Sequence, residues 1–204
     1  MFKISKKEPK YFASAKSKVK LPKVKEAWSD KNISEIRARL RKDILEKEQN
    51  NLCIYCEKRI SDNSKKSNID HFKTRNLFPE KSLDYDNLLV SCNVNERCSS
   101  LKDSKKSLLK NRDDYENIID PTIENPNDFF YYLLSGEIVP IDENKAQFTI
   151  DIFNLNQQSL SDERKILADT LKYCTDLSFD EIFENFGYEY QSFIKNIYPK
   201  LKEL

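Results

Sequence analysis

The sequence has two glycines, one histidine and no long apolar run. Sparse glycine together with 34% charged residues indicates a soluble, helix-rich protein. No apolar segment is long enough to cross a bilayer, so we expect no membrane partner. The N-terminus is basic but lacks the apolar stretch of a secretory signal peptide, which predicts a cytoplasmic protein. No internal repeat is evident, so repeat architectures are not expected.

Cysteine is present in a pattern that favours metal binding. A cytosolic chain is not expected to rely on disulfides, so its cysteines indicate either a metal site or buried thiols. Cys53 and Cys56 form a C-x-x-C knuckle, which places two thiolates on one side of a tight turn. Cys92 and Cys98 supply a second pair with a wider spacing. Together the four predict a tetrahedral structural Zn²⁺ site, with a set of buried thiols as the alternative.

Charge is unevenly distributed along the chain, although the formal net charge is only +1. Nine lysines fall within residues 3–25, and residues 102–112 are again rich in Lys and Arg. Basic faces on a nearly neutral protein suit a polyanionic partner such as a nucleic acid. A solvated charged surface is the alternative interpretation of the same pattern.

The order of predicted elements indicates an α+β protein with three parts. We interpret residues 1–31 as a basic arm that docks on a partner and lies outside the core. Residues 32–112 form the central unit, and residues 113–204 form an α-rich extension with a small hairpin. The predicted elements are a helix over 32–49, strands over 68–72 and 85–92, a helix over 99–111, a short helix over 127–134, a hairpin of 137–141 with 147–152 across 142–144, and helices over 160–174, 178–186 and 188–203.

The only histidine, His71, directly follows Asp70 on a predicted strand. Hydrolysis of a phosphodiester needs a base that deprotonates water and a divalent cation that neutralises charge. A neutral imidazole suits the first role, which makes His71 the candidate general base. A carboxylate suits the second, so Asp70 is the candidate ligand for Mg²⁺ or Mn²⁺. Asn87 is a candidate for holding the imidazole in orientation.

These motifs resemble the HNH (ββα-metal) endonuclease superfamily, and more closely the HNH subunit of Septu-type and retron-associated anti-phage systems. The resemblance is carried by Leu52–Glu57, Ile69–Lys73, Phe78–Glu80 and Asp84–Asn93. It implies a ββα-metal core with zinc on Cys53, Cys56, Cys92 and Cys98. It also implies that His71, Asp70 and Asn87 are catalytic, and that an ATPase subunit is a partner.

The sequence departs from the family pattern after the last knuckle cysteine. Related sequences supply a final metal ligand there, whereas this chain has Ser99-Ser100. We expect the metal to be held by Asp70, with Asp103 as a candidate helper. In this fold the following helix packs beside the metal, so Lys102, Lys105 and Lys106 are predicted to bind the nucleic-acid backbone. A solvated basic face is the alternative.

Three functions remain open from the sequence. The first is a metal-dependent endonuclease that hydrolyses DNA within an anti-phage complex. The second is a non-catalytic, zinc-bound adaptor that binds nucleic acid or the ATPase, which the two serines favour. The third is a nuclease directed at RNA, including tRNA, since the chemistry at the phosphate is nearly the same.

Overall fold

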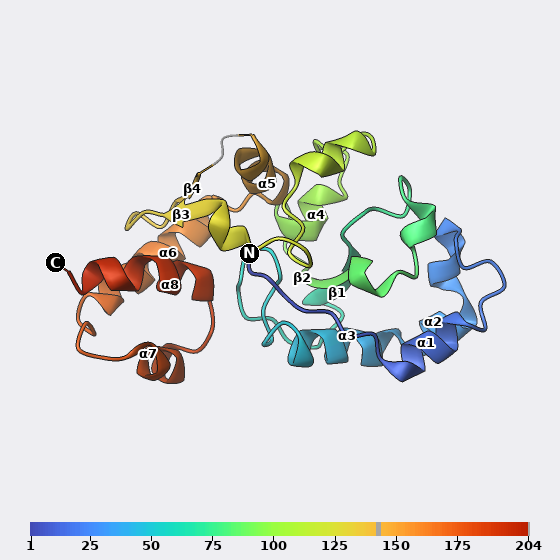
Figure 1. The fold of residues 1–204 in the computed structure, drawn as a ribbon, viewed down its shortest axis with the longest axis horizontal. Helices are drawn as coiled ribbons and strands as arrows, with labels where there is room; N and C mark the ends of the chain where they lie inside the picture. The colour runs from blue at the N-terminus through green and yellow to red at the C-terminus, as the bar shows by residue number, and fades with distance from the viewer. Residues whose placement is uncertain (142–143, 204) are drawn as a thin grey trace.

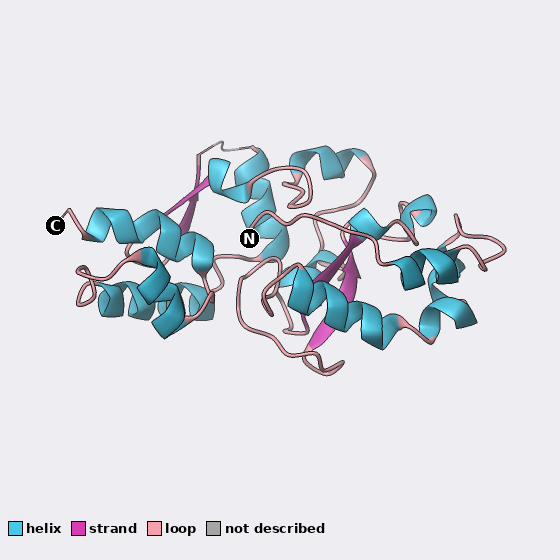
Figure 2. Cartoon of the chain, turned by 60° about the horizontal axis from the view of Figure 1, so that its bottom comes forward, coloured by secondary structure: helices cyan, strands magenta, loops and turns pink. Residues whose placement is uncertain are grey.

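The computed structural model describes residues 1–141 and 144–203 and shows an α+β fold, as predicted. Short helices surround two small antiparallel sheets (Figures 1 and 2). The helices and strands are α1 (Lys10–Lys16), α2 (Lys31–Ser34), α3 (Arg37–Lys47), β1 (Ser67–His71), β2 (Leu88–Cys92), α4 (Cys98–Lys102), β3 (Phe130–Tyr132), β4 (Ile138–Pro140), α5 (Lys145–Phe153), α6 (Gln158–Leu171), α7 (Phe179–Phe186) and α8 (Gln191–Leu201). Short 3₁₀ turns occur at Lys25–Ser29, Pro79–Lys81, Tyr85–Asn87, Asp113–Asn117 and Pro126–Asp128.

The molecule is elongated, with the two sheets in different halves (Figure 1). Helices α1 and α2 lie at one end, the β1–β2 sheet lies nearer the middle, and α6–α8 lie at the other end with the C-terminus. Helix α4 contacts both β2 and α5, so it joins the first sheet to the second half. None of the described helices is both long enough and apolar enough to cross a membrane.

The β1–β2 pair is the centre of the first half. It runs antiparallel, with Ser67 opposite Cys92 and His71 opposite Leu88. Every residue of β2 is buried. The buried Gln49 side chain extends the pairing, because its amide accepts from Val90 N and donates to Val90 O at 2.8 Å each. This fixes the end of α3 against β2 and holds the knuckle that follows beside the strand.

The N-terminal segment corrects the prediction that residues 1–31 lie outside the core. Phe2, Ile4 and Phe12 are buried in the hydrophobic core, as are Ala27 and Trp28. The lysines between them suggested an unpacked arm because charge dominated the composition, while the widely spaced apolar residues carry the packing. Docking of a partner on this segment stays a prediction.

Two predicted helices are shorter than expected. The helix over 32–49 divides at Glu35–Ile36 into α2 and α3, and Asp30 caps α2 through a bond from Asn32 N. The helix over 99–111 ends at Lys102. Beyond it, the hydroxyls of Ser104 and Ser107 accept from backbone N–H groups two residues later. Such local bonds compete with helical ones, which accounts for the early end.

The second sheet forms from different partners than predicted. Residues 130–132 form β3 instead of part of a helix, and β3 pairs with β4 around Gly136. Residues 147–152 lie in helix α5. Of the predicted turn at 142–144, residues 142 and 143 lie outside the described part of the chain. The three C-terminal helices are confirmed with shifted ends, as is the Ser178–Glu181 capping box of α7.

Gly136→Ala is expected to destabilise the second half. Gly136 has φ +85, and a Cβ there would stand 2.0 Å from the backbone oxygen of Ser161 and 2.9 Å from the backbone nitrogen of Lys165. A strained backbone and a clash with helix α6 predict a loss on the order of 1–3 kcal/mol in the free energy of unfolding. Denaturant titration measures it. The exposed neighbour provides the control, since Ser135→Ala should change stability by less than about 0.5 kcal/mol; equal losses would show that the close approach does not matter.

Candidate active-site cleft and metal centre

Four buried cysteines converge from three separate segments. Cys53 and Cys56 lie on the knuckle after α3, Cys92 ends β2, and Cys98 begins α4. Their four sulfur atoms all lie within 4.8 Å of one another. They are the only group of three or more Cys, His, Asp or Glu side chains, among the described residues, that could hold a metal ion. The sequence prediction that these four residues meet is therefore in agreement with the structure.

The distances between the sulfur atoms suit tetrahedral coordination. Cys53 Sγ lies 3.8 Å from Cys98 Sγ, and Cys56 Sγ lies 4.0 Å from Cys92 Sγ. Four sulfurs at about 2.3 Å from one Zn²⁺ would be about 3.8 Å apart. Hydrogen bonds from the other cysteines, Cys53 first, lower the pKa of the Cys92 thiol, while a hydrogen bond from Cys53 raises the pKa of Cys56 and burial raises that of Cys98.

The knuckle also reaches the candidate catalytic residues. Tyr55, between the two knuckle cysteines, is buried and stacks on Phe153 with ring centroids 3.9 Å apart. Its hydroxyl donates a short hydrogen bond to Asp70 Oδ2. The position of the Asp70 carboxylate therefore depends on the same turn that supplies two of the four thiols.

His71 ends β1 and lines a cleft of about 540 Å³. Its Nε2 lies 3.0 Å from the carbonyl oxygen of Ser82. A carbonyl only accepts, so Nε2 carries the proton and Nδ1 keeps a free lone pair. His71 is 7% exposed, and burial lowers its pKa to about 4. The imidazole is therefore neutral at neutral pH, as a general base requires.

The cleft around His71 is basic and includes the N-terminal segment. The ring of Trp28 meets the imidazole edge-on, with centroids 4.7 Å apart. Arg75, Lys25 and Lys110 line the same cleft, together with Asp70. Positive side chains at the walls would attract an anionic substrate toward His71.

Asn87 holds the loop next to His71 and does not bond to the imidazole in the described structure. Its carbonyl accepts from Lys73 N at 2.7 Å, and its amide donates to the carbonyls of Lys73 and Lys81 at 3.0 and 3.1 Å. Ser82, which accepts from His71, directly follows Lys81. The orienting role of Asn87 stays a prediction; in the structure its side chain holds the loop that carries Ser82.

Lys102 is the largest departure from the predicted site. Its side chain is 0% exposed, and its ammonium lies 3.0 Å from Asp70 Oδ1 and 2.8 Å from Asp103 Oδ1. It also donates to the carbonyl oxygen of His71 at 2.7 Å. Burial alone would lower the pKa of Lys102, but the carboxylates of Asp70 and Asp103 outweigh it and raise the pKa above its ordinary value. The ammonium is a fixed internal cation between two carboxylates.

The burial of Lys102 corrects its predicted contact with a nucleic-acid backbone. A side chain with no exposed surface cannot reach a backbone in solvent. Lys102 shares the buried face of α4 with Cys98 and Ser99, which places its side chain toward Asp70, whereas the basic composition of the segment had suggested an exposed face. Lys105 and Lys106 are exposed, and their predicted role stays a prediction.

The donors around Asp70 fit a divalent cation in part. Asp70 Oδ1 is buried and accepts no hydrogen bond from the described residues, although the Lys102 ammonium lies beside it. Asp103 offers a second carboxylate in the same cleft. Oxygen ligands of this kind suit Mg²⁺ or Mn²⁺. The position between the two carboxylates is held by the ammonium, so a cation there would compete with Lys102.

Three residues of this site were not identified from the sequence. Tyr55 and Trp28 carry no motif of their own, and Ser82 contributes only its backbone carbonyl. Only Tyr55 could have been identified from the sequence, because it lies between two predicted metal ligands and a turn that binds metal also fixes the side chains between them. The contact between Trp28 and His71 spans distant segments and has no local pattern.

Two curated proteins are similar to this chain, while no family model matches it. A Septu protein PtuB from Bacillus thuringiensis is 33% identical over 144 residues, which are 68% of this chain and 49% of that protein. A protein of Vibrio cholerae, named as a candidate HNH endonuclease of retron Vc95, is 30% identical over 143 residues, 65% of each chain. The chain thus spans about half the length of the first relative. These relatives confirm the resemblance to HNH-type nucleases of anti-phage defence systems.

Cys56→Ser is expected to remove the metal and destabilise the first half of the molecule. Loss of one thiolate opens the tetrahedral set, and loss of a structural metal predicts a destabilisation above about 4 kcal/mol. Elemental analysis of the purified protein and thermal unfolding measure the two effects. Cys174→Ser is the matched control, because Cys174 lies outside the cluster and should keep full metal content. Equal metal content in both variants would contradict the assignment.

Lys102→Met is expected to destabilise the protein by about 3–5 kcal/mol, because it leaves the buried Asp70 carboxylate without a counter-charge. If a divalent cation binds at Asp70, millimolar Mg²⁺ or Mn²⁺ should raise the stability of the variant. The same addition should raise the stability of the natural protein less, because Lys102 already pairs with Asp70 there. Thermal unfolding with and without the cation measures the difference. A loss that does not respond to either cation would argue against a cation site at Asp70.

Proposed function

We propose that this relative of the HNH-type defence nucleases is the metal-dependent endonuclease subunit of an anti-phage system, with His71 as its general base. The proposal is supported most directly by the state of His71. Its imidazole is neutral, its Nε2–H is bound to Ser82 O, and no described residue bonds to Nδ1. The free nitrogen lies in a cleft with basic walls, where a phosphodiester and a water molecule could meet it.

Strands β1 and β2 and helix α4 would form the ββα-metal core. The strands pair antiparallel, α4 contacts β2, and the Asp70–Lys102 contact joins the helix to β1. The four cysteines would hold structural Zn²⁺, which their sulfur spacing supports. Because these cysteines come from the knuckle, from β2 and from α4, zinc would fix the three parts of the core relative to one another.

In the proposed reaction, Nδ1 of His71 takes a proton from a water molecule, whose oxygen attacks phosphorus while the bond to the leaving oxygen breaks. Asp70, helped by Asp103, would bind Mg²⁺ or Mn²⁺, which neutralises charge on the phosphate and the leaving oxygen. Ser82 keeps the imidazole in the tautomer that exposes Nδ1. Asn87 positions Ser82 through the loop, and Tyr55 orients Asp70.

A partner ATPase belongs to the proposal because the family resemblance implies one. The exposed lysines of residues 3–25 are the predicted docking surface, carried on a segment whose apolar residues pack into the core. Such a segment would contact both a partner on its outer side and, through Trp28, the imidazole on its inner side. This arrangement supports control of the cleft by a bound partner.

A non-catalytic adaptor is the second candidate, and one observation favours it. The ammonium of Lys102 lies where a cation bound to Asp70 would need to be, and Ser99 and Ser100 offer no strong metal ligand. An adaptor would keep the cysteine cluster and bind nucleic acid or the ATPase without hydrolysis. The two functions differ in whether His71 matters for activity.

His71→Ala is expected to reduce cleavage by at least about 10²-fold, because it removes the group that takes the proton from water in the proposed reaction. The assay uses plasmid DNA and total tRNA with Mg²⁺ or Mn²⁺, in the presence and absence of the ATPase encoded beside this protein. The two substrates distinguish the DNA and RNA hypotheses. Circular dichroism and the thermal midpoint serve as the control that the variant is folded.

Cleavage that persists in folded His71→Ala would refute the base assignment. Absence of cleavage by the natural protein with every substrate, metal and partner combination would favour the adaptor.

A further inference from the structure

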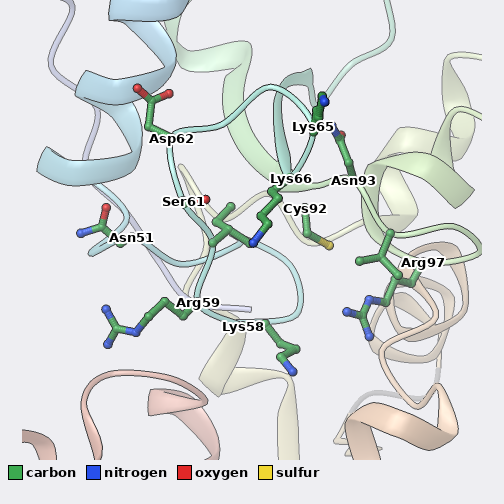
Figure 3. A pocket seen from close by; sticks show the side chains of 12 residues that line it. Asn51, Lys58, Arg59, Ser61, Asp62, Lys65, Lys66, Cys92, Asn93 and Arg97 are labelled. Atoms are coloured by element: carbon green, nitrogen blue, oxygen red, sulfur yellow. The ribbon is translucent and has the colours of Figure 1, made fainter.

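A second concavity, lined by basic side chains and by Cys92 of the cysteine cluster, shares no lining residue with the His71 cleft. It has a volume of about 670 Å³ and opens between the knuckle loop and the end of β2 (Figure 3). Lys66 reaches across it, and other basic side chains stand around its rim (Figure 3). We call it the basic hollow; its charged lining residues are Lys58, Arg59, Lys65, Lys66, Arg97 and Asp62.

Most of the positive charge in the basic hollow is not neutralised within the protein. The one acidic lining residue, Asp62, is already bound to Arg41 outside the hollow at 2.7 Å. Lys58 is paired with Glu163. Arg59, Lys65 and Lys66 are exposed, and no ion pair involves them in the part of the chain that the structure describes. Several unpaired cations around one concavity focus a positive potential there.

The cysteine cluster accounts for only part of this charge. Cys92 lines the hollow, and four thiolates on Zn²⁺ would carry two net negative charges. Arg97 is the lining side chain that lies closest in sequence to these thiolates, next to Cys98, and its positive charge would offset part of their negative charge. It is 7% exposed, and its Nε has no hydrogen-bond partner among the described residues. The exposed Lys65 and Lys66 side chains are not needed to offset the charge of the thiolates, so they can bind an anion from solvent.

The basic hollow and the active-site cleft are lined by successive residues of the chain that leads into β1. Lys66 directly precedes β1, and its carbonyl accepts from Asn93 N at 3.1 Å, which continues the pairing of the two strands. Alternate residues of a strand share a face, so Lys66, Asn68 and Asp70 lie in a row. Lys66 lines the hollow, while Asn68 and Asp70 line the cleft. Four residues of strand span about 13 Å, which is about four base-pair steps of duplex DNA.

We infer that the basic hollow binds the phosphodiester backbone of the nucleic acid a few nucleotides from the bond that is cut. The choice of a nucleic acid as occupant rests on the proposed function. A backbone that crosses the hollow would meet Lys65, Lys66 and Arg59, and would be directed along β1 into the cleft. Binding of this kind is insensitive to sequence and depends on salt.

The test is a charge reversal of two exposed lysines, Lys65→Glu with Lys66→Glu. Both variants carry His71→Ala, so that binding is measured without cleavage. The probes are a 20-base-pair DNA duplex and an RNA hairpin, each titrated at several salt concentrations. The matched control reverses two exposed lysines on α8, Lys195→Glu with Lys200→Glu, which do not line the hollow, and so changes the net charge equally outside it.

The inference predicts that the hollow variant binds at least one probe at least about tenfold more weakly, with a salt slope lower by about 2, while the control stays within about twofold. Equal weakening in both double variants, or unchanged binding in the hollow variant, would overturn it. Polyglutamate that displaces the probe as well as unlabelled DNA does would also overturn the inference, because this result would indicate a site for acidic peptides.

The outcome is separable from that of the proposed function. Binding that depends on Lys65 and Lys66 in a protein that never cleaves would support the hollow and refute the nuclease. Cleavage by the natural protein, together with unchanged binding in the hollow variant, would support the nuclease and refute the hollow. Thermal midpoints of both double variants confirm that each is folded.

Discussion

The convergence of four cysteines from three segments is the constraint on which the rest of the site depends. The knuckle, the end of β2 and the start of α4 also bond to one another directly, since Ile54 N donates to Val90 O and Ser99 N donates to Ser91 Oγ, and the thiol cluster adds to these contacts. Tyr55 carries this constraint onward, because it lies within the knuckle and donates to Asp70. The cysteine cluster and the Asp70–His71 site are thus connected through one side chain, that of Tyr55.

The buried charge beside the candidate active site consists mainly of one ion pair, Asp70 with Lys102. Asp70 is fully buried beside one lysine, and that lysine also bonds to the backbone carbonyl of His71. Removing either member would leave an uncompensated charge away from water, which is far costlier than losing an exposed ion pair. The same ammonium therefore contacts both the Asp70 carboxylate and the backbone at the end of strand β1. A catalytic cation at this place would have to share the carboxylate with Lys102.

The sequence predicted the parts of the fold that local chemistry determines. The knuckle, the Asp70–His71 strand and the capping box of α7 follow from short-range patterns, and each is found where expected. Several errors arise where a nearby segment or side chain offers hydrogen bonds other than the predicted ones. Residues 130–132 became a strand because they pair with 138–140, and the helix after Cys98 stopped where serine hydroxyls offered other bonds. The charged N-terminal segment concealed apolar residues too widely spaced to form a recognisable pattern.

The pairing of Trp28 with His71 has an experimental consequence. They are the only tryptophan and the only histidine in the chain, and their rings are 4.7 Å apart. Indole emission from this protein therefore arises from a single place, at the wall of the cleft. Fluorescence at tryptophan-selective excitation, and the one pair of imidazole nitrogen resonances in an NMR spectrum, report on the same few ångströms without any label or substitution.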